Sequence, residues 1–267
     1  MAHYRTAWIS DVHLGTKGAQ ALSLLEFIKQ NEFETLYLVG DIVDVWALKR
    51  GIYWPQEHND VIQKLLREAR KGTRLFYIPG NHDEFVVGFD GQFGNVSIQQ
   101  QAIHVTAKGE KILVIHGHEL DTVVQNMGWL AHVGDMGYKM LIELNRLNNF
   151  MRNFLKLKPW SLSAYVKNEV KNVVSFIGKF EEGIVRYARE HQVDSVLCGH
   201  IHHASMHRID GINYYNTGDW VESCTAIVEE LDGSLKLLTD LNITLHRPDE
   251  VGTKQRKPEL VLTAVGV

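Results

Sequence analysis

Three segments decide the fold: RTAWISDVHLG at residues 5–15, TLYLVGDIVD at 35–44 and RLFYIPGNHDE at 74–84. Each begins with a short apolar run, which is typical of a buried strand, and each ends in a polar turn that contains Gly or Asp. The segments between them, 19–30 and 58–71, are predicted helices. This β-α-β-α-β order predicts an α/β fold, with a parallel sheet that carries helices on both faces.

The rest of the chain adds further strands around a long helical block. The predicted strands are 95–98, 102–106, 111–116, 195–198, 212–216, 224–230 and 235–239. The helical block, 121–189, is interrupted at Lys158-Pro159. We therefore predict a core of residues 1–120 and 190–246, a helical insertion at 121–189 and a surface tail at 247–267.

Composition excludes several classes of protein. The 267 residues are 45% hydrophobic and 22% charged, as in an ordinary globular chain, and a net charge of −4 argues against general nucleic-acid binding. No apolar run approaches the roughly 20 residues that span a bilayer, and the first residues lack the layout of a signal peptide. Cys198 and Cys224 lie far apart in the sequence, as expected for reduced thiols in a cytoplasmic protein.

Five polar turns follow predicted strands and hold many of the 14 histidines. The carboxyl ends of the strands gather at one edge of such a sheet, where ligands bind. Carboxylates and imidazoles suit Mn²⁺, iron, Zn²⁺ or Mg²⁺, and the lack of a thiolate argues against structural zinc. The turns are Asp11-Val12-His13, Gly40-Asp41-Ile42-Val43-Asp44, Gly80-Asn81-His82-Asp83, Ile115-His116-Gly117-His118 and Gly199-His200-Ile201-His202.

In this order, DxH, GDxxD, GNHD, His-Gly and GHxH, the turns resemble those of the calcineurin-like metallophosphoesterases, over residues 8 to about 220. The resemblance implies an α/β/β/α sandwich of two mixed β-sheets flanked by helices, with a helical-hairpin lid. It also implies two divalent ions and a hydroxide between them that attacks phosphorus. Manganese is the first candidate for these ions, and iron, zinc and magnesium are the alternatives. The implied ligands are Asp11, His13 and His202 for one ion, Asn81, His116 and His200 for the other, and Asp41 for both.

Two more residues of these turns have implied catalytic roles. In the family, the residue at His82 points at the phosphoryl oxygens, where it stabilises the transition state or protonates the leaving group. Asp44 is implied to orient His82 and to raise its pKa. The residues alone leave a second interpretation of Asp44 open, namely the N-cap of a following helix.

The helical block is basic. Residues 139–179 contain eight Lys or Arg and two acidic residues, a net charge of +6, and more apolar positions than one packing face needs. One interpretation is a helical pair that packs on the sheet. The other is a lid with an apolar groove and a basic rim, which would suit a phosphorylated amphiphile taken from an anionic membrane surface.

The insertion, together with Trp46, resembles the UDP-2,3-diacylglucosamine pyrophosphatase branch of the family. That branch cleaves a lipid A precursor to UMP and 2,3-diacylglucosamine 1-phosphate. It implies a cytoplasmic enzyme, peripheral on the anionic inner membrane. The implied substrate contacts are Trp46, Asp121, Lys167, Asn168 and Lys171.

This chain departs from the branch at two positions. It has Ala164 where the lid pattern of the branch has Ser, and His82 where the branch has Arg. Arg and His are not equivalent partners for a diphosphate. The alternative function is therefore a related phosphodiesterase or phosphatase that acts on another nucleotide- or lipid-linked phosphoester. A catalytically inactive scaffold is disfavoured because all seven candidate ligands and His82 are present.

Overall fold

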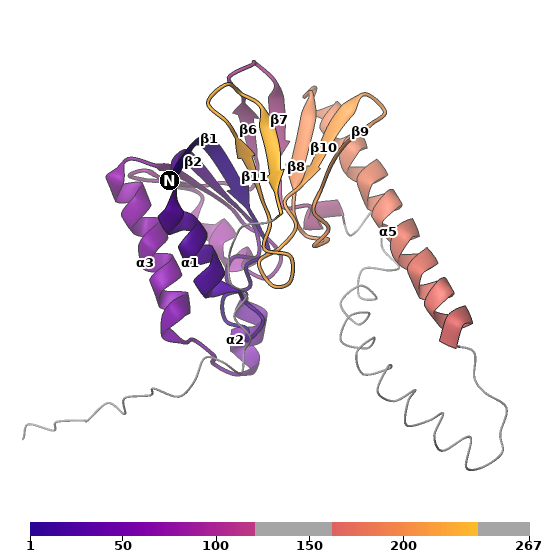
Figure 1. Cartoon of the computed structure of the whole chain (residues 1–267), viewed down its shortest axis with the longest axis horizontal. Coiled ribbons are helices and arrows are strands. Elements are labelled where there is room, and N and C mark those ends of the chain that lie inside the picture. Colours follow the sequence, from indigo (N-terminus) through magenta and orange to yellow (C-terminus); the bar gives the residue numbers. More distant parts are fainter. Residues whose placement is uncertain (121–161, 240–267) are drawn as a thin grey trace, which may run out of the picture.

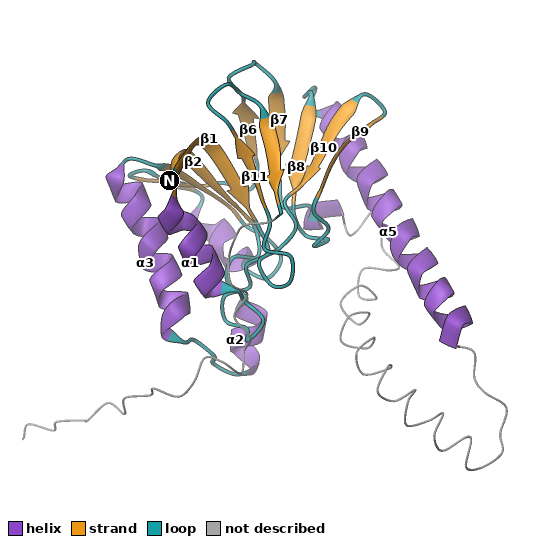
Figure 2. Ribbon diagram, viewed as in Figure 1, coloured by secondary structure: helices purple, strands orange, loops and turns teal. Residues whose placement is uncertain are grey.

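The computed structural model describes residues 1–120 and 162–239, in which two mixed β-sheets pack face to face (Figures 1 and 2). The first sheet has seven strands in the order β12-β11-β1-β2-β3-β5-β4. Strands β1, β2, β3 and β5 are parallel, and antiparallel strands flank them on both sides. The bounds are β1 Ala2–Ile9, β2 Asn31–Val39, β3 Arg74–Ile78, β4 Gly91–Phe93, β5 Val96–Ile98, β11 Ala226–Glu229 and β12 Leu235–Leu238.

The second sheet has five strands in the order β6-β7-β8-β10-β9. Its three central strands are parallel, and both edge strands are antiparallel to their neighbours. The two mixed sheets predicted from the family resemblance are thereby confirmed. The bounds are β6 Ala102–Val105, β7 Lys111–Val114, β8 Ser195–Cys198, β9 Ser205–Ile209 and β10 Ile212–Asn216.

Helices cover the outer face of each sheet. Helices α1, Ala21–Gln30, and α3, Gln56–Lys71, form one core with the first sheet. Helix α5, Leu162–Glu190, forms another with the second sheet, on the opposite side of the molecule in Figure 2. A third core fills the space between the sheets. The helices and sheets therefore form the layers of an α/β/β/α sandwich.

The expectation that helices would cover both faces of one parallel sheet is wrong. In β1, the side chains of Ala7 and Ile9 pack with α1 and α3, whereas Trp8 lies between the two sheets. All three are fully buried. A strand buried on both faces has the same continuous apolar sequence whether a helix or a second sheet covers it.

Three predicted strands, 74–78, 195–198 and 212–216, have the bounds that the sequence indicated. Helix α2, Val45–Arg50, is the helix that one interpretation of Asp44 left open. The sequence did not predict the 3-10 helices η1, Glu84–Phe89, and η2, His118–Leu120, or the edge strands β4 and β9. Residues 121–161 of the predicted lid and the predicted tail, 247–267, lie outside the described residues. The lid hairpin and the domain bounds therefore stay predictions.

Candidate metal centre

The loops after β1, β2, β3, β7 and β8 meet at one edge of the sandwich. Backbone hydrogen bonds join the first two: the amide of Asp11 donates to the carbonyl of Gly40 at 3.1 Å, and that of His13 to Asp41 at 2.9 Å. The amide of Gly199 donates to the carbonyl of His116 at 3.1 Å within the second sheet. Both sheets therefore supply polar side chains to one place.

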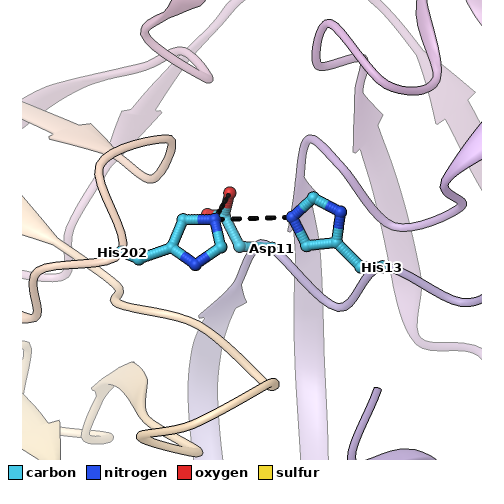
Figure 3. Close-up of side chains that lie close together, drawn as sticks. All are labelled: Asp11, His13 and His202. Carbon is cyan, nitrogen blue, oxygen red and sulfur yellow. Dashed lines mark hydrogen bonds and ion pairs between the residues drawn. The ribbon is translucent and has the colours of Figure 1, made fainter. Parts of the chain in front are cut away.

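The first group that could hold a metal ion consists of Asp11, His13 and His202, whose ligand atoms all lie within 4.8 Å of one another (Figure 3). His202 Nε2 lies 3.2 Å from Asp11 Oδ1 and 3.4 Å from His13 Nε2. Asp11 is fully buried. One carboxylate oxygen and two imidazole nitrogens that converge in this way form a donor set for a divalent transition metal.

The second group consists of Asp41, His116 and His200. His116 Nδ1 donates to the carbonyl of Val39 at 2.9 Å, which leaves Nε2 facing Asp41 Oδ2 at 3.4 Å. A backbone carbonyl on the outer nitrogen is the usual way in which a ligating histidine is oriented. A third group combines Asp41 with His13 and His82. Asp41 therefore lies between the two histidine sets, where the bridging ligand is predicted.

Asn81, the remaining predicted ligand, has a buried Oδ1 atom with no hydrogen-bond partner among the described residues. A buried amide oxygen is ordinarily paired, so an unpaired one calls for an explanation. A cation is an explanation that also suits the neighbouring carboxylates and imidazoles. The donor set of the described residues thus fits two divalent ions.

Electrostatics favour ionised carboxylates in this cluster. Burial opposes the charge of Asp11, but His202 outweighs it and holds the pKa of Asp11 at about 2. Burial also opposes charge on the histidines, yet Asp11 raises the pKa of His202 to about 9 and Asp41 raises that of His116 to about 10. The buried anions are therefore stabilised by nearby positive charge, which divalent cations would supply in place of these protons.

Five of the seven predicted ligands have a left-handed backbone conformation. Non-glycine residues rarely adopt positive φ, and strain of this kind clusters at functional sites. The backbone is therefore held in a costly shape where it presents the donor atoms. The φ angles are 51° at Asp11, 52° at His13, 54° at Asp41, 69° at His200 and 53° at His202.

Glycines in the motifs let the ligands approach the backbone closely. A Cβ atom at Gly40, where φ is +77°, would overlap the ring of His116. A Cβ atom at Gly80 would overlap the carboxylate of Asp41 and lie 2.6 Å from its amide nitrogen. The glycine that precedes Asp41 and the one that precedes Asn81 are thus required by packing at the site.

Asp44 makes the contacts expected from both interpretations that the sequence left open. Its Oδ2 lies 3.2 Å from His13 Nδ1, and its Oδ1 lies 3.0 Å from His82 Nδ1. Oδ1 also accepts a hydrogen bond of 2.7 Å from the amide of Ala47, so Asp44 is the N-cap of α2. Despite its burial, its contacts with the two histidines lower the pKa of Asp44. One carboxylate therefore orients two rings, each of which places Nε2 3.9 Å from Asp41 Oδ2.

The fully buried Asp83 is a structural residue of the site that the sequence reasoning did not single out. Its carboxylate accepts hydrogen bonds from the amide of Gly80 at 2.6 Å and that of Ile42 at 2.8 Å, and from the hydroxyl of Tyr77 at 2.6 Å. It thereby fastens the loop that carries Asn81 to the loop that carries Asp41. Its place in the GNHD turn was the only signal in the sequence.

Of the predicted substrate contacts, the structure describes the side chain of Trp46 and not those of the other four. Trp46 lies in the first turn of α2, with its ring centroid 4.4 Å from that of His82. Lys167, Asn168 and Lys171 lie on α5, but their side chains are outside the described part of the chain. Asp121 is also outside the described residues. These four contacts stay predictions.

The calcineurin-like phosphoesterase family matches residues 4–204, a range that includes every predicted ligand. The chain belongs to this family. Its members are metal-dependent phosphoesterases, and the His and Asp groups described above provide the metal-binding side chains. The predicted hydrolase class is confirmed, and the identity of the metal stays a prediction.

Among its relatives, UDP-2,3-diacylglucosamine hydrolase of Psychromonas ingrahamii is 29% identical over 248 residues, covering 85% of this phosphoesterase and 94% of the relative. The enzyme of the same name from Pectobacterium atrosepticum is 26% identical over 260 residues, covering 90% and 97%. The E. coli phosphoesterase Yfce is 13% identical, with a TM-score of 0.43 over 88% of this chain and 98% of that one. Within the described ranges of this phosphoesterase, no helix combines the length and hydrophobicity needed to cross a membrane.

Proposed function

We propose that this phosphoesterase cleaves the diphosphate of UDP-2,3-diacylglucosamine, with release of UMP and 2,3-diacylglucosamine 1-phosphate. The observation that carries the proposal is that enzymes named for this substrate align with the chain over 94–97% of their own length. The family match, residues 4–204, also spans all seven predicted ligands.

The proposed ligands are the seven predicted residues, six of which lie in the His and Asp groups of the structure. Asp11, His13 and His202 would hold one ion, and Asp41 would be shared between the two. The second ion would be held by Asn81, His116 and His200. Two divalent ions, with manganese as the first candidate, acidify water and neutralise charge on the phosphate during an in-line displacement. The histidines and carboxylates of this chain would supply the ligand atoms from the loops that follow the strands.

His82 would act on the phosphate directly. Asp44 faces its Nδ1 atom, so Nε2 is directed toward Asp41 and the rest of the cluster. From there, His82 can donate a proton to the leaving oxygen or a hydrogen bond to a phosphoryl oxygen as negative charge develops. Asp44 is a positioning residue in this scheme, because it acts through His82 and His13.

We also propose that the helical insertion binds the acylated sugar and the membrane surface. Lys167 and Lys171 would contact phosphate and anionic lipid headgroups, and Asn168 would contact the sugar. Asp121 would also contact the substrate. The enzyme would then work at the cytoplasmic face of the inner membrane as a peripheral protein, without nucleic acid as a partner.

His82 itself favours one alternative. A histidine replaces the Arg that is typical of the lipid A enzymes, and a titratable ring does not bind a diphosphate as a bidentate guanidinium does. The second candidate is a phosphodiesterase or phosphatase that acts on a different nucleotide- or lipid-linked phosphoester with the same cluster.

Product analysis decides between the two. The Mn²⁺-loaded protein is incubated separately with UDP-2,3-diacylglucosamine, with dinucleoside polyphosphates and with simple phosphodiesters. Release of UMP from the lipid substrate at a far higher kcat/KM than from the others supports the proposal. Hydrolysis of the soluble esters without the lipid substrate contradicts it and favours the alternative. Asp41→Ala is the control for contaminating hydrolases.

A further inference from the structure

A pocket of about 480 Å³ lies beside His82, between helix α2 and the 3-10 helix η1. Its size is in the range of small-molecule sites, roughly 300–1,000 Å³. Because it borders His82, a ligand held there is close enough to be covalently part of a substrate whose phosphate lies at the metal centre. The lining residues are Val45, Trp46, Lys49, His82, Glu84, Phe85, Val87 and Gly88.

Hydrogen bonds hold the two walls of the pocket together. The amide of Val45, the first residue of α2, donates to the carbonyl of His82 at 3.1 Å. Asp44 caps the same helix and faces both His13 and His82. On the other wall, the buried Val86 anchors η1. The wall formed by the start of α2 is therefore hydrogen-bonded directly to His82, which borders both the pocket and the metal cluster.

The side chains of the pocket suit a flat polar ring. The indole of Trp46 is tilted by 35° against the imidazole of His82 and keeps 44% of its surface exposed. Phe85, on the opposite wall, is 57% exposed. Lys49 and Glu84 add a hydrogen-bond donor and an acceptor at the same pocket. An acyl chain could cover the aromatic surface but could make no hydrogen bond to the ammonium or the carboxylate.

We infer that this pocket binds the nucleobase of a nucleotide-linked substrate, with Trp46 as the stacking surface. A pyrimidine ring offers a π-face to Trp46 and Phe85, and its carbonyl and N–H groups can pair with Lys49 and Glu84. The inference rests on the proposed function for the identity of that base, uracil. The preference for a nucleobase can be tested with any nucleotide ester.

The test compares two esters that share one leaving group. Thymidine 5′-(p-nitrophenyl phosphate) carries a base, and methyl p-nitrophenyl phosphate does not. The readout is the kcat/KM of the thymidine ester divided by that of the methyl ester, both measured on the Mn²⁺-loaded protein. In Trp46→Ala this ratio is expected to fall roughly 5- to 150-fold, which corresponds to the loss of one base stack. Trp54→Ala is the matched control, because Trp54 is 37% exposed and does not line the pocket.

Binding without turnover gives a second readout. UMP is expected to quench tryptophan fluorescence of the wild type at lower concentration than ribose 5-phosphate, and Trp46→Ala is expected to abolish that difference. Equal affinity of the wild type for the two phosphates would overturn the inference. So would an equal loss of kcat/KM on both esters in Trp46→Ala, or a selective loss on a diester with an alkyl chain.

These outcomes are separable from those of the proposed function. If UDP-2,3-diacylglucosamine is cleaved but the ratio of the two esters does not change in Trp46→Ala, the nucleobase pocket is refuted and the proposed function stands. If the lipid substrate is not cleaved but the ratio falls as expected, the proposed substrate is wrong and the nucleobase pocket is supported.

Discussion

Replacing Asp83 by asparagine tests whether one buried carboxylate holds two metal-binding loops in place. The substitution keeps the shape of the side chain and exchanges one acceptor oxygen for an NH₂ group. In one orientation, the amides of Ile42 and Val43 and the hydroxyl of Tyr77 lose their acceptor. In the other, the amides of Gly80 and Asp41 do. Because a backbone amide can only donate and cannot pair with an NH₂ group, either orientation breaks the clamp.

The expected magnitude follows from the contacts that are lost. A hydrogen bond to a charged group contributes about 1.5–3 kcal/mol, so the loss of one or two lowers the free energy of unfolding by about 2–5 kcal/mol. A domain of ordinary stability, about 5–15 kcal/mol, stays folded after such a loss. Displacement of the loops that carry Asp41 and Asn81 is expected to weaken Mn²⁺ binding more than tenfold.

Two measurements check this expectation. Urea unfolding in the presence of a chelator gives the change in stability, and calorimetric titration with Mn²⁺ gives the change in affinity. Asp90→Asn is the control. Asp90 is exposed and accepts one long hydrogen bond, of 3.5 Å, from the side chain of Gln100. Wild-type Mn²⁺ affinity together with an unfolding free energy within about 0.5 kcal/mol of the wild type would refute the clamp.

Three further predictions follow from other parts of the molecule. Asp41→Ala is expected to lose both ions and nearly all turnover. His82→Ala is expected to keep bound Mn²⁺ but to lose about 10²- to 10⁴-fold in kcat. Equal activity of His82→Ala and wild type would exclude a role of His82 in catalysis. Burial lowers the pKa of His104, so the unfolded chain binds the proton first and stability falls as the pH drops through about 6.5. Urea unfolding at pH 5.5 and 7.5 measures this effect. The free energy of unfolding should change less between the two pH values in His104→Gln than in the wild type, and an equal change in both proteins would contradict the prediction. Replacing Lys167 and Lys171 by alanine should reduce sedimentation with anionic vesicles and its salt dependence; unchanged sedimentation would favour a helix that only packs on the sheet.

The strands and the order of the donor residues could be predicted because they depend on local patterns. Apolar runs that end in Gly- or Asp-containing turns locate β3, β8 and β10, and the carboxyl ends of such strands locate the cluster. Strand β9, SMHRI, was missed because it is an edge strand with a polar, partly exposed sequence. Among the strands of residues 1–120 and 162–239, it pairs with β10 alone, so pairing rather than hydrophobicity defines it.

The sequence could not show which groups, far apart in the chain, contact the same side chain. Asp83 accepts from the amide of Ile42, 41 positions earlier, and no local pattern records that contact. Asp44 faces both His13 and His82 while it caps α2, so the two interpretations of its role were never exclusive. Which layer covers Trp8 likewise depends on how the second sheet packs against the first.

The central claim is that loops from both sheets hold a pair of divalent cations for phosphoester hydrolysis. Anomalous diffraction at the manganese edge, from crystals soaked in Mn²⁺, tests it most directly. Two peaks about 3.5–4 Å apart are expected, with Asp41 between them. One peak should adjoin Asp11, His13 and His202, and the other Asn81, His116 and His200. A map with no peak at this cluster, or a single peak that does not contact Asp41, would contradict the account.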